Sequence, residues 1–270
     1  ALIDYIDKIN ISFGAPEEYF TTKNSKIAKS ALSHGINLLE AKVRHLGTEN
    51  NYKILTEIYE YLKDKVTFKF NTSVEEIVVK DKNLAIKTKN ELISAKYIIA
   101  APGRAGADWF SEQCKSIGIN LLNNQVDVGV RVEVPAMVFE HITDEVYEAK
   151  LVYRTKQYGD LVRTFCMNPK GYVVNENTDG IITVNGHSYR DEALQSTNTN
   201  FALLVSNKFT EPFKEPHKYG KSIASFSNML GGGVLVQRFG DLIKGRRSSE
   251  HRIEQSFVKP TLQATAGDLS

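Results

Sequence analysis

Apolar residues in the first 120 positions change between a helical spacing and the short runs that are typical of strands. Leu2, Ile6 and Ile9 lie three or four positions apart, as on one face of a helix, whereas Val78 and Val79 belong to a short β-branched run between turn residues. The pattern predicts helices over 2–9, 26–33, 52–62 and 105–117, a short helical turn over 15–20, and strands over 36–43, 66–70, 73–79, 84–88 and 98–101.

Small apolar residues at 98–101 end in Pro102-Gly103, just before the helix predicted from residue 105. This predicts a buried strand, a sharp turn and a helix start. Glycine lets a ligand approach the backbone closely, and a helix start offers N–H groups to anionic or carbonyl oxygens. An ordinary buried strand with a tight turn is the alternative interpretation.

From residue 126 onward the pattern is one of repeated strands. Every second residue from Val126 to Val134 is apolar and the others are mostly polar, which predicts one buried face, one available face and an antiparallel sheet. A helix is predicted over 219–230, ended by Gly231-Gly232-Gly233, and Ser248 is the predicted N-cap of a short later helix. The predicted strands are 126–134, 150–155, 161–167, 172–174, 181–184 and 201–205.

Composition excludes several classes of protein. Of the 270 residues, 41% are hydrophobic, which is ample for a buried core. The formal net charge of +2 requires no nucleic-acid surface, and no apolar run reaches the roughly 18 residues of a membrane span. Cys114 and Cys166 lack metal-type spacing, so we expect no metal site, a reducing compartment and a cytoplasmic location.

Six segments together resemble the bacterial family of FAD-utilising dehydrogenases, often labelled NAD(P)/FAD-dependent oxidoreductases. The resemblance implies an α+β fold, with part of a FAD/NAD(P)-binding-type domain and a mainly antiparallel β substrate domain. The segments are Phe13-Gly14-Ala15-Pro16-Glu17-Glu18, Arg44-His45-Leu46-Gly47-Thr48, Val126-Asp127-Val128-Gly129-Val130-Arg131-Val132-Glu133, Arg163-Thr164-Phe165-Cys166-Met167, Val184-Asn185-Gly186-His187-Ser188 and Gln237-Arg238-Phe239-Gly240-Asp241.

The family opens with a strand, a Gly-x-Gly-x-x-Gly turn and a helix that holds the FAD pyrophosphate, and the present sequence has no such pattern. We therefore expect an interior fragment, inactive by itself, that lacks this motif and the closing flavin segment. Its expected parts are a helical leading segment (1–35), a partial FAD-binding domain (36–118), a substrate domain (126–258) and a linker back to the missing flavin segment (259–270).

The resemblance implies FAD as cofactor, with NAD(P)H as a candidate electron donor. A loop before the helix at 52–62 would run near the isoalloxazine ring, where a cation stabilises the negative charge of the reduced flavin. Arg44 and His45 are the candidates for that role, and a surface arginine with a loop histidine is the alternative. The expected cofactor contacts are Gly47, Thr48, the backbone of Val74, and the turn Ala101, Pro102, Gly103 and Arg104.

Polar residues in the later strands are candidates for contact with a small-molecule substrate. Arg131 and Arg163 could pair with a carboxylate, or lie on a solvated face of the sheet. His187 follows Asn185-Gly186 in a predicted turn, and could act as general acid or base or be structural. The expected function is hydride transfer through flavin N5 to or from an unknown substrate. The alternative is a non-catalytic module that binds a small ligand or a partner protein.

Overall fold

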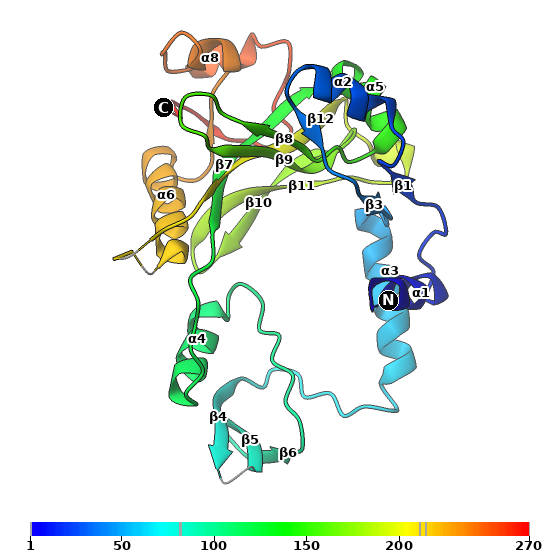
Figure 1. Cartoon of the computed structure of the whole chain (residues 1–270), viewed down its shortest axis with the longest axis vertical. Coiled ribbons are helices and arrows are strands. Elements are labelled where there is room, and N and C mark those ends of the chain that lie inside the picture. Colours follow the sequence, from blue (N-terminus) through cyan, green and yellow to red (C-terminus); the bar gives the residue numbers. More distant parts are fainter. Residues whose placement is uncertain (1, 81–82, 211, 214, 270) are drawn as a thin grey trace. The chain divides into compact units, whose positions relative to one another are not determined.

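The computed structural model describes residues 2–80, 83–210, 212–213 and 215–269. Contacts divide the chain into two compact units, one of Ala1–Tyr59 with Gln125–Ser270 and one of Glu60–Asn124. Helices combine with mostly antiparallel sheets, which confirms the α+β class (Figure 1). The four-part division expected from the sequence stays a prediction.

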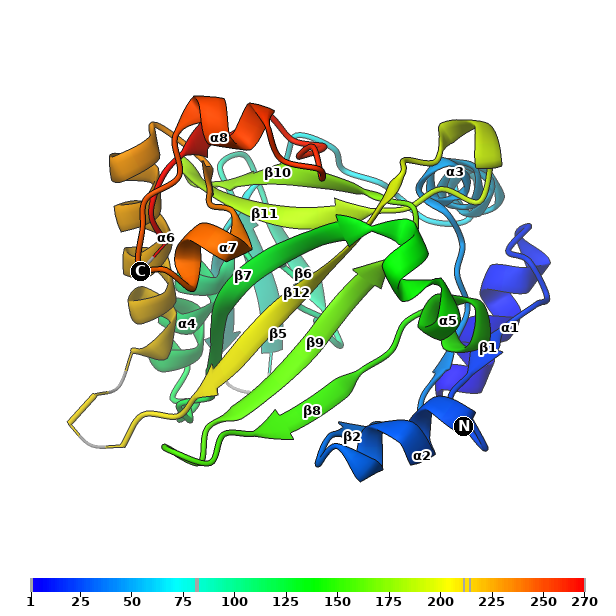
Figure 2. The same ribbon diagram turned by 90° about the horizontal axis from the view of Figure 1, so that it is seen from above.

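The first unit is built on an antiparallel five-stranded sheet with the order β2-β8-β9-β12-β7 (Figure 2). β7 pairs with β12 along its whole length, from Val126 opposite Asn207 to Pro135 opposite Asn198. The strands are β2 (Asn37–Leu38), β7 (Val126–Pro135), β8 (Leu151–Arg154), β9 (Leu161–Asn168) and β12 (Asn198–Asn207).

The apolar face of this sheet packs against α5 (Ala136–Val146), a helix that the sequence analysis did not predict. Buried Val146, Met167 and Phe201 form the centre of the core with Ala149. The ring of Phe139, on α5, lies 5.1 Å from that of Phe201. The hydrophobic core therefore lies between α5 and one end of the sheet.

The opposite face of the sheet is polar, and it is less available than the alternation of β7 predicted. Asp127, Arg131 and Glu133 point to this side of β7, yet all three are half-buried. The hairpin of β10 (Tyr172–Thr178) and β11 (Ile181–His187) covers part of it, because Gly186 lies against the Arg131 side chain (Figure 1). Polar groups here must find partners inside the protein.

A β-bulge interrupts β9 where this polar face begins. Asn168 pairs with Asn200 and Phe165 with Ala202, so that two residues of β9 stand opposite one residue of β12. Cys166 takes up the irregularity with a φ of 47°. The bulge sends Met167 to the core and keeps Asn168 beside Asn200.

Short elements near the start of the first unit correct two predictions. Residues 15–20 form no helical turn, since β1 (Phe20–Thr21) begins there and pairs with β3 (Lys42–Val43). The single strand predicted over 36–43 is two strands in two sheets, because β2 pairs with β8 instead. The helices of this region are α1 (Leu2–Ser12), α2 (Lys26–Ser33) and α3 (Thr48–Leu62).

The last part of the first unit surrounds a buried carboxylate. α6 (Pro216–Gly231) ends at Gly232, whose φ of 64° confirms the predicted helix stop. Asp241 is 1% exposed and accepts hydrogen bonds from Arg252, Arg246 and Ser248. The remaining elements are η1 (Glu192–Leu194), α7 (Phe239–Leu242), α8 (Glu250–Glu254), β13 (Leu235–Val236) and β14 (Thr265–Ala266).

The Asp241 cluster corrects the role of Ser248. Ser249 is the N-cap of α8, whereas the Ser248 hydroxyl donates to Asp241 Oδ2 at 2.8 Å and accepts from the Arg238 N–H at 3.0 Å. Hydrogen bonds from Arg252 and then Arg246 hold the pKa of the Asp241 carboxyl well below its usual value. The Asp241 carboxylate and the Ser248 hydroxyl therefore connect the segments that contain Arg238, Arg246 and Arg252.

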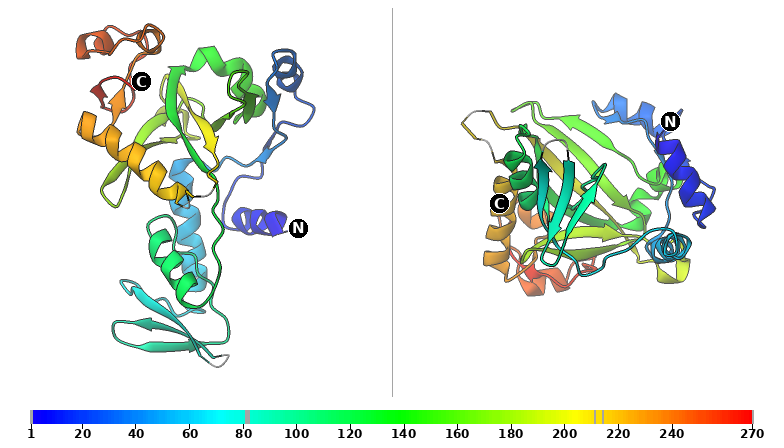
Figure 3. Two further views of the ribbon diagram at one scale, coloured as in Figure 1. Left: turned by 60° about the vertical axis from the view of Figure 1, so that its left-hand side comes forward. Right: turned by 90° about the horizontal axis from the view of Figure 1, so that it is seen from below.

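The second unit holds a three-stranded antiparallel sheet, β4 (Val74–Lys80), β5 (Asn83–Thr88) and β6 (Leu92–Ala95), with α4 (Ala107–Ser116) (Figure 3). Side chains of α4 bind the edge of β4, since Trp109 Nε1 donates to the Glu75 carbonyl at 3.0 Å and the Ile77 N–H donates to Gln113 Oε1 at 2.8 Å. These two hydrogen bonds hold α4 against the edge of the sheet.

Two predicted strands of the second unit are wrong. Residues 66–70 and 98–101 form no strand, and the strand before α4 is β6, which ends at Ala95. Within the described part of the chain no strand pairs with 97–101, and a strand needs a partner for its backbone groups. The side chain of Ile99 is 94% exposed and that of Tyr97 is 76% exposed.

Candidate functional site

Arg44 connects α1 with residues 16–18 through hydrogen bonds. Its guanidinium donates to both carboxylate oxygens of Asp7, at 2.6 and 2.7 Å, and to the carbonyls of Pro16 and Glu18. The hydrogen bonds from Arg44 lower the pKa of Asp7. All three nitrogen atoms of the guanidinium are thus engaged within the chain, and the flavin contact of Arg44 stays a prediction.

His45 lies in an aromatic cluster around Tyr147. The imidazole stacks on the Tyr147 ring at 4.4 Å, and Phe20 lies 4.8 Å from the same ring. Nε2 of His45 is buried and has no hydrogen-bond partner. Burial lowers the pKa of His45 to about 4, with the nearby Arg190 acting in the same direction, so the ring is neutral near pH 7.

Tyr147 itself sits in a strained turn. Its φ of 57° and ψ of −66° and the 2.7 Å hydrogen bond from the Glu148 N–H to the Val146 carbonyl define a γ-turn. The hydroxyl lies 2.9 Å from Ser188 Oγ, and burial raises the pKa of Tyr147. The surrounding hydrogen bonds and ring contacts hold this turn in place.

The neutral state of His45 predicts a loss of stability in acid. The pKa of His45 is about 4 in the folded protein against 6.5 for an ordinary histidine, so only the unfolded chain binds the proton between these values. Its contribution is fully present above about pH 6.5 and falls as the pH drops towards 4. We expect a loss of roughly 1–2 kcal/mol, after allowance for partial exposure to solvent.

The measurement is the free energy of urea unfolding of the wild type and of His45→Phe at about pH 7.5 and about pH 4.5. The phenylalanine keeps the stacking on Tyr147 but binds no proton, so its pH dependence should be weaker. His141→Gln, at an exposed position of α5, is the matched control. Equal pH dependence in the wild type and His45→Phe would show that the imidazole does not contribute.

Gly47 and Thr48 join the start of α3 to the end of β11. Gly47 has a φ of 82°, and a side chain there would meet the carboxylate of Glu49. The Thr48 N–H and hydroxyl both donate to the Ser188 carbonyl, at 3.1 and 3.2 Å, while Glu49 Oε1 accepts from the Arg190 N–H at 2.8 Å. Their predicted cofactor contacts remain untested.

The second unit contains the other predicted cofactor contacts. Residues 101–104 are an exposed turn before α4, in which Gly103 has a φ of 69° and open space around it. Val74 begins β4 and pairs with Thr88. The turn exists as expected, and its role in binding FAD stays a prediction.

His187 does not lie in a turn. It is the exposed last residue of β11, opposite Tyr172, and Asn185 and Gly186 are paired within the same strand. The reversal of this hairpin occurs at Asp179 and Gly180, which have φ values of 54° and 82°. Asn-Gly indicated a turn here because of its local preference, which strand pairing overrides.

Arg131 is the centre of a half-buried polar network. Its Nη1 donates to Asn200 Oδ1 at 2.6 Å and to the Cys166 carbonyl at 3.1 Å, and Nη2 approaches Asn185 Oδ1 at 3.4 Å. Burial lowers the pKa of Arg131. Asn168 continues the network, since its Nδ2 donates to the Cys166 carbonyl at 2.7 Å.

The network reaches Tyr147 through Ser188, whose hydroxyl donates to Asn168 Oδ1 at 3.3 Å. Sequence analysis did not identify Asn168, Asn185, Asn200 or Ser188 as site residues. Asparagines inside strands are the signal that could have found them, because asparagine is depleted in strands. Asn200 and Asn185 accept hydrogen bonds from Arg131, and Asn168 and Ser188 extend the same network.

Arg163 lies on the same face of the sheet with partners of its own. It forms an ion pair with Asp127, and Asp127 Oδ1 accepts from the Ser206 hydroxyl at 2.6 Å. The guanidinium carbon lies 5.1 Å from the centre of the Phe165 ring. Both predicted substrate arginines are therefore brought to one face, and both are fixed in place.

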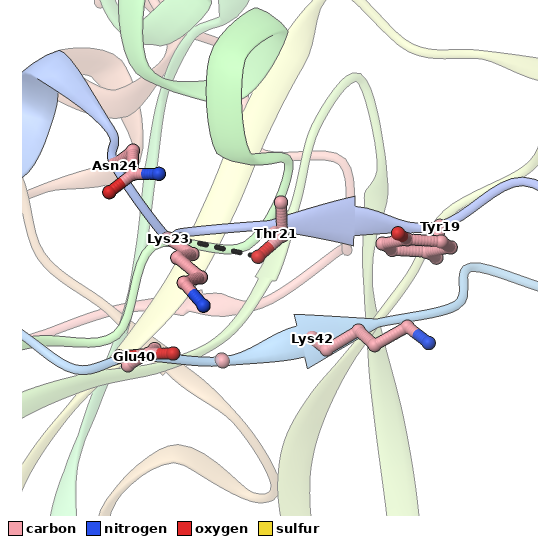
Figure 4. A pocket seen from close by; sticks show the side chains of 7 residues that line it. Tyr19, Thr21, Lys23, Asn24, Glu40 and Lys42 are labelled. Carbon is pink, nitrogen blue, oxygen red and sulfur yellow. Dashed lines mark hydrogen bonds between the residues drawn. The ribbon is translucent and has the colours of Figure 1, made fainter. Parts of the chain in front are cut away.

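A hollow of about 460 Å³ lies elsewhere, beside β1 and β3 (Figure 4). Tyr19, Thr21, Lys23, Asn24, Glu40 and Lys42 line it together with Ala41. The Lys42 ammonium lies 4.1 Å from the centre of the Tyr19 ring. None of the predicted site residues belongs to this hollow.

The residues that the structure describes contain no group of three or more His, Cys, Asp or Glu that could hold a metal ion. No helix among them is long and apolar enough to cross a membrane.

Comparison with known families identifies the β-rich half of the chain. Residues 125–268 match the model described as FAD-dependent protein, C-terminal domain-like. The chain belongs to this FAD-dependent family. No curated protein matches it. The match covers β7, β8, β9 and β12 of the sheet, the β10–β11 hairpin and the Asp241 cluster, and therefore the whole network around Arg131.

Membership of the FAD-dependent family implies FAD as a cofactor. The described residues could contact some parts of FAD, but they do not suit its pyrophosphate. Three buried donors have no acceptor, namely Arg131 Nε, Arg163 Nε and Asn200 Nδ2, which suits an oxygen-rich ligand. The pyrophosphate needs a glycine-rich turn between a strand and a helix, and Gly231–Gly233 instead form the end of α6. These residues therefore do not form the pyrophosphate site of this motif.

Proposed function

We propose that the protein is an FAD-dependent oxidoreductase in which residues 125–268 form the substrate domain. The match of these residues to the FAD-dependent family is the observation that carries the proposal. FAD, when bound, supplies hydride transfer through its N5 atom, to or from a small-molecule substrate, with NAD(P)H as a candidate electron donor. The proposal includes a cytoplasmic location and no nucleic-acid or membrane partner.

The chain's own residues would bind and orient the reactants. Arg131 and Arg163 would hold an anionic group of the substrate, and the exposed His187 would hold or release a proton at its imidazole. Cofactor contacts are proposed for the loop that contains Arg44, His45, Gly47 and Thr48, for the backbone of Val74, and for Ala101, Pro102, Gly103 and Arg104.

The test is the visible absorbance spectrum of the natural protein that carries this sequence, followed by anaerobic titration with NADH and NADPH. A flavin band that bleaches with one of them supports the oxidoreductase and identifies its donor. The 270 residues expressed alone should be colourless, because they lack the pyrophosphate turn. A natural protein that is colourless and cannot be reconstituted with FAD would favour a binding module without catalysis.

A further inference from the structure

The guanidinium of Arg131 is half-buried, and no carboxylate among the described residues contacts it. Its acceptors are the amide oxygens of Asn200 and Asn185 and the carbonyl of Cys166. Glu133, the nearest acid on the same face of β7, accepts from the Thr261 hydroxyl at 2.6 Å. A half-buried cation with neutral partners only is costly, and an anion supplied from outside would relieve that cost.

The unused donors of this cluster are the ones that suit a carboxylate. Nη1 of Arg131 is occupied, whereas Nε has no acceptor and Nη2 has only the 3.4 Å contact with Asn185. The Nε and Nη2 hydrogens form the planar fork that binds a carboxylate through both oxygens. Asn200, which is 0% exposed, adds a further unpartnered donor, Nδ2.

Two small residues border these donors, Gly186 in close backbone contact and Ala202 on β12. A Cβ at Gly186 would lie 2.5 Å from Arg131 Nη1 and would also meet Asn168 Nδ2 and Asn200 Oδ1. Ala202, directly opposite Arg131 on β12, adds only a methyl group to the same face. A small ligand could therefore lie over Ala202 without meeting a large side chain of β12.

An aromatic surface lies next along the same row. Ala202 pairs with Phe165 on β9, so Arg131, Ala202 and Phe165 form one row across three strands. The Phe165 ring is 39% exposed, with Lys150 Nζ 5.6 Å and Arg163 Cζ 5.1 Å from its centre. Two strand spacings separate the ends of the row, about 10 Å, which is enough for a carboxylate and one ring.

We propose that the row Arg131, Ala202 and Phe165 binds a small aromatic carboxylate. The carboxylate would meet the Nε and Nη2 edge of Arg131, and the ring would lie against Phe165. Calling this ligand the substrate rests on the proposed function, whereas the binding itself requires no flavin. The inference thus narrows the substrate class to planar, ring-bearing acids.

Calorimetric titration of the purified chain with sodium benzoate tests the proposal, with sodium acetate and sodium phosphate compared at equal ionic strength. We expect saturable benzoate binding at least tenfold tighter than that of acetate or phosphate. Arg131→Met and Phe165→Leu should each weaken benzoate binding at least tenfold. Arg154→Met, an exposed arginine of β8 that donates to the Gly159 carbonyl, should leave it unchanged.

Asn200→Asp keeps the proposal testable if Arg131→Met does not fold. The aspartate has the shape of the asparagine, removes the unpartnered Nδ2 and gives Arg131 a carboxylate of its own, so the variant should fold and lose benzoate binding. Benzoate binding as tight as in the wild type would overturn the proposal. So would absent benzoate binding by the wild type, or phosphate binding of equal strength.

Failure here and failure of the proposed function are separable. A natural protein with a flavin that bleaches, but whose chain does not bind benzoate, would remove only the aromatic carboxylate. Benzoate binding that depends on Arg131, in a natural protein that holds no flavin, would retain the site and remove the oxidoreductase.

Discussion

Alanine in place of Gly129 should lower the free energy of unfolding by about 3 kcal/mol or more. Gly129 lies in β7, and a Cβ there would meet the Leu203 carbonyl oxygen and lie 2.9 Å from Leu204 Cα, both in β12. These are backbone atoms, which cannot move unless the β7–β12 pairing opens. The same strand β12 also pairs with β9, so the disturbance would spread through the sheet.

Urea unfolding followed by far-UV circular dichroism measures this loss. Gly240→Ala is the matched control, because a Cβ at Gly240 in α7 meets no atom within 4 Å. We expect the control to change stability by less than about 1 kcal/mol, in the stabilising direction. An unchanged unfolding midpoint for Gly129→Ala would contradict the close approach of β7 and β12.

Phe201→Ala should lower the free energy of unfolding by about 3–5 kcal/mol. Phe201 is 8% exposed and packs in the core with Val146 and Met167, and its ring lies 5.1 Å from that of Phe139. The alanine removes most of these contacts and leaves a cavity between α5 and the sheet. Thermal and urea unfolding of the variant would measure the loss.

Leu203→Ala is the control for Phe201→Ala. Leu203 lies two residues further along β12, on the same face of the sheet, but its side chain is 38% exposed. It should therefore lose only about 1 kcal/mol, the transfer free energy of a partly exposed side chain. Equal losses for the two variants would mean that α5 does not cover the sheet at Phe201.

The sequence predicted correctly those helices and strands whose local pattern agrees with their contacts in the folded protein. The alternation of Val126 to Val134 predicted the strand β7, and the glycines after residue 230 predicted the end of α6. The helix α5 was missed although Phe139, Ile142 and Val146 are spaced three and four apart behind Pro135. That spacing is the helical signal for α5, which begins directly after Pro135.

The candidate site could be predicted only in part, because its contacts join distant residues. Alternation alone places Arg131 on the polar face of β7, but Cys166 and Asn200, its hydrogen-bond partners, are 35 and 69 positions away. The bulge at Cys166 changes the register of β9, and no local preference indicated it. Turn preference likewise misplaced His187, which the pairing of β10 with β11 keeps in a strand.

The apolar residues 97–101 have a practical consequence for handling the protein. They carry no charge and no proline, Ile99 is 94% exposed, and no strand within the described part of the chain pairs with them. Exposed apolar segments of this kind promote association between molecules. Protein concentration is therefore the variable to limit during purification, and a lysine at position 99 would oppose such aggregation by charge repulsion.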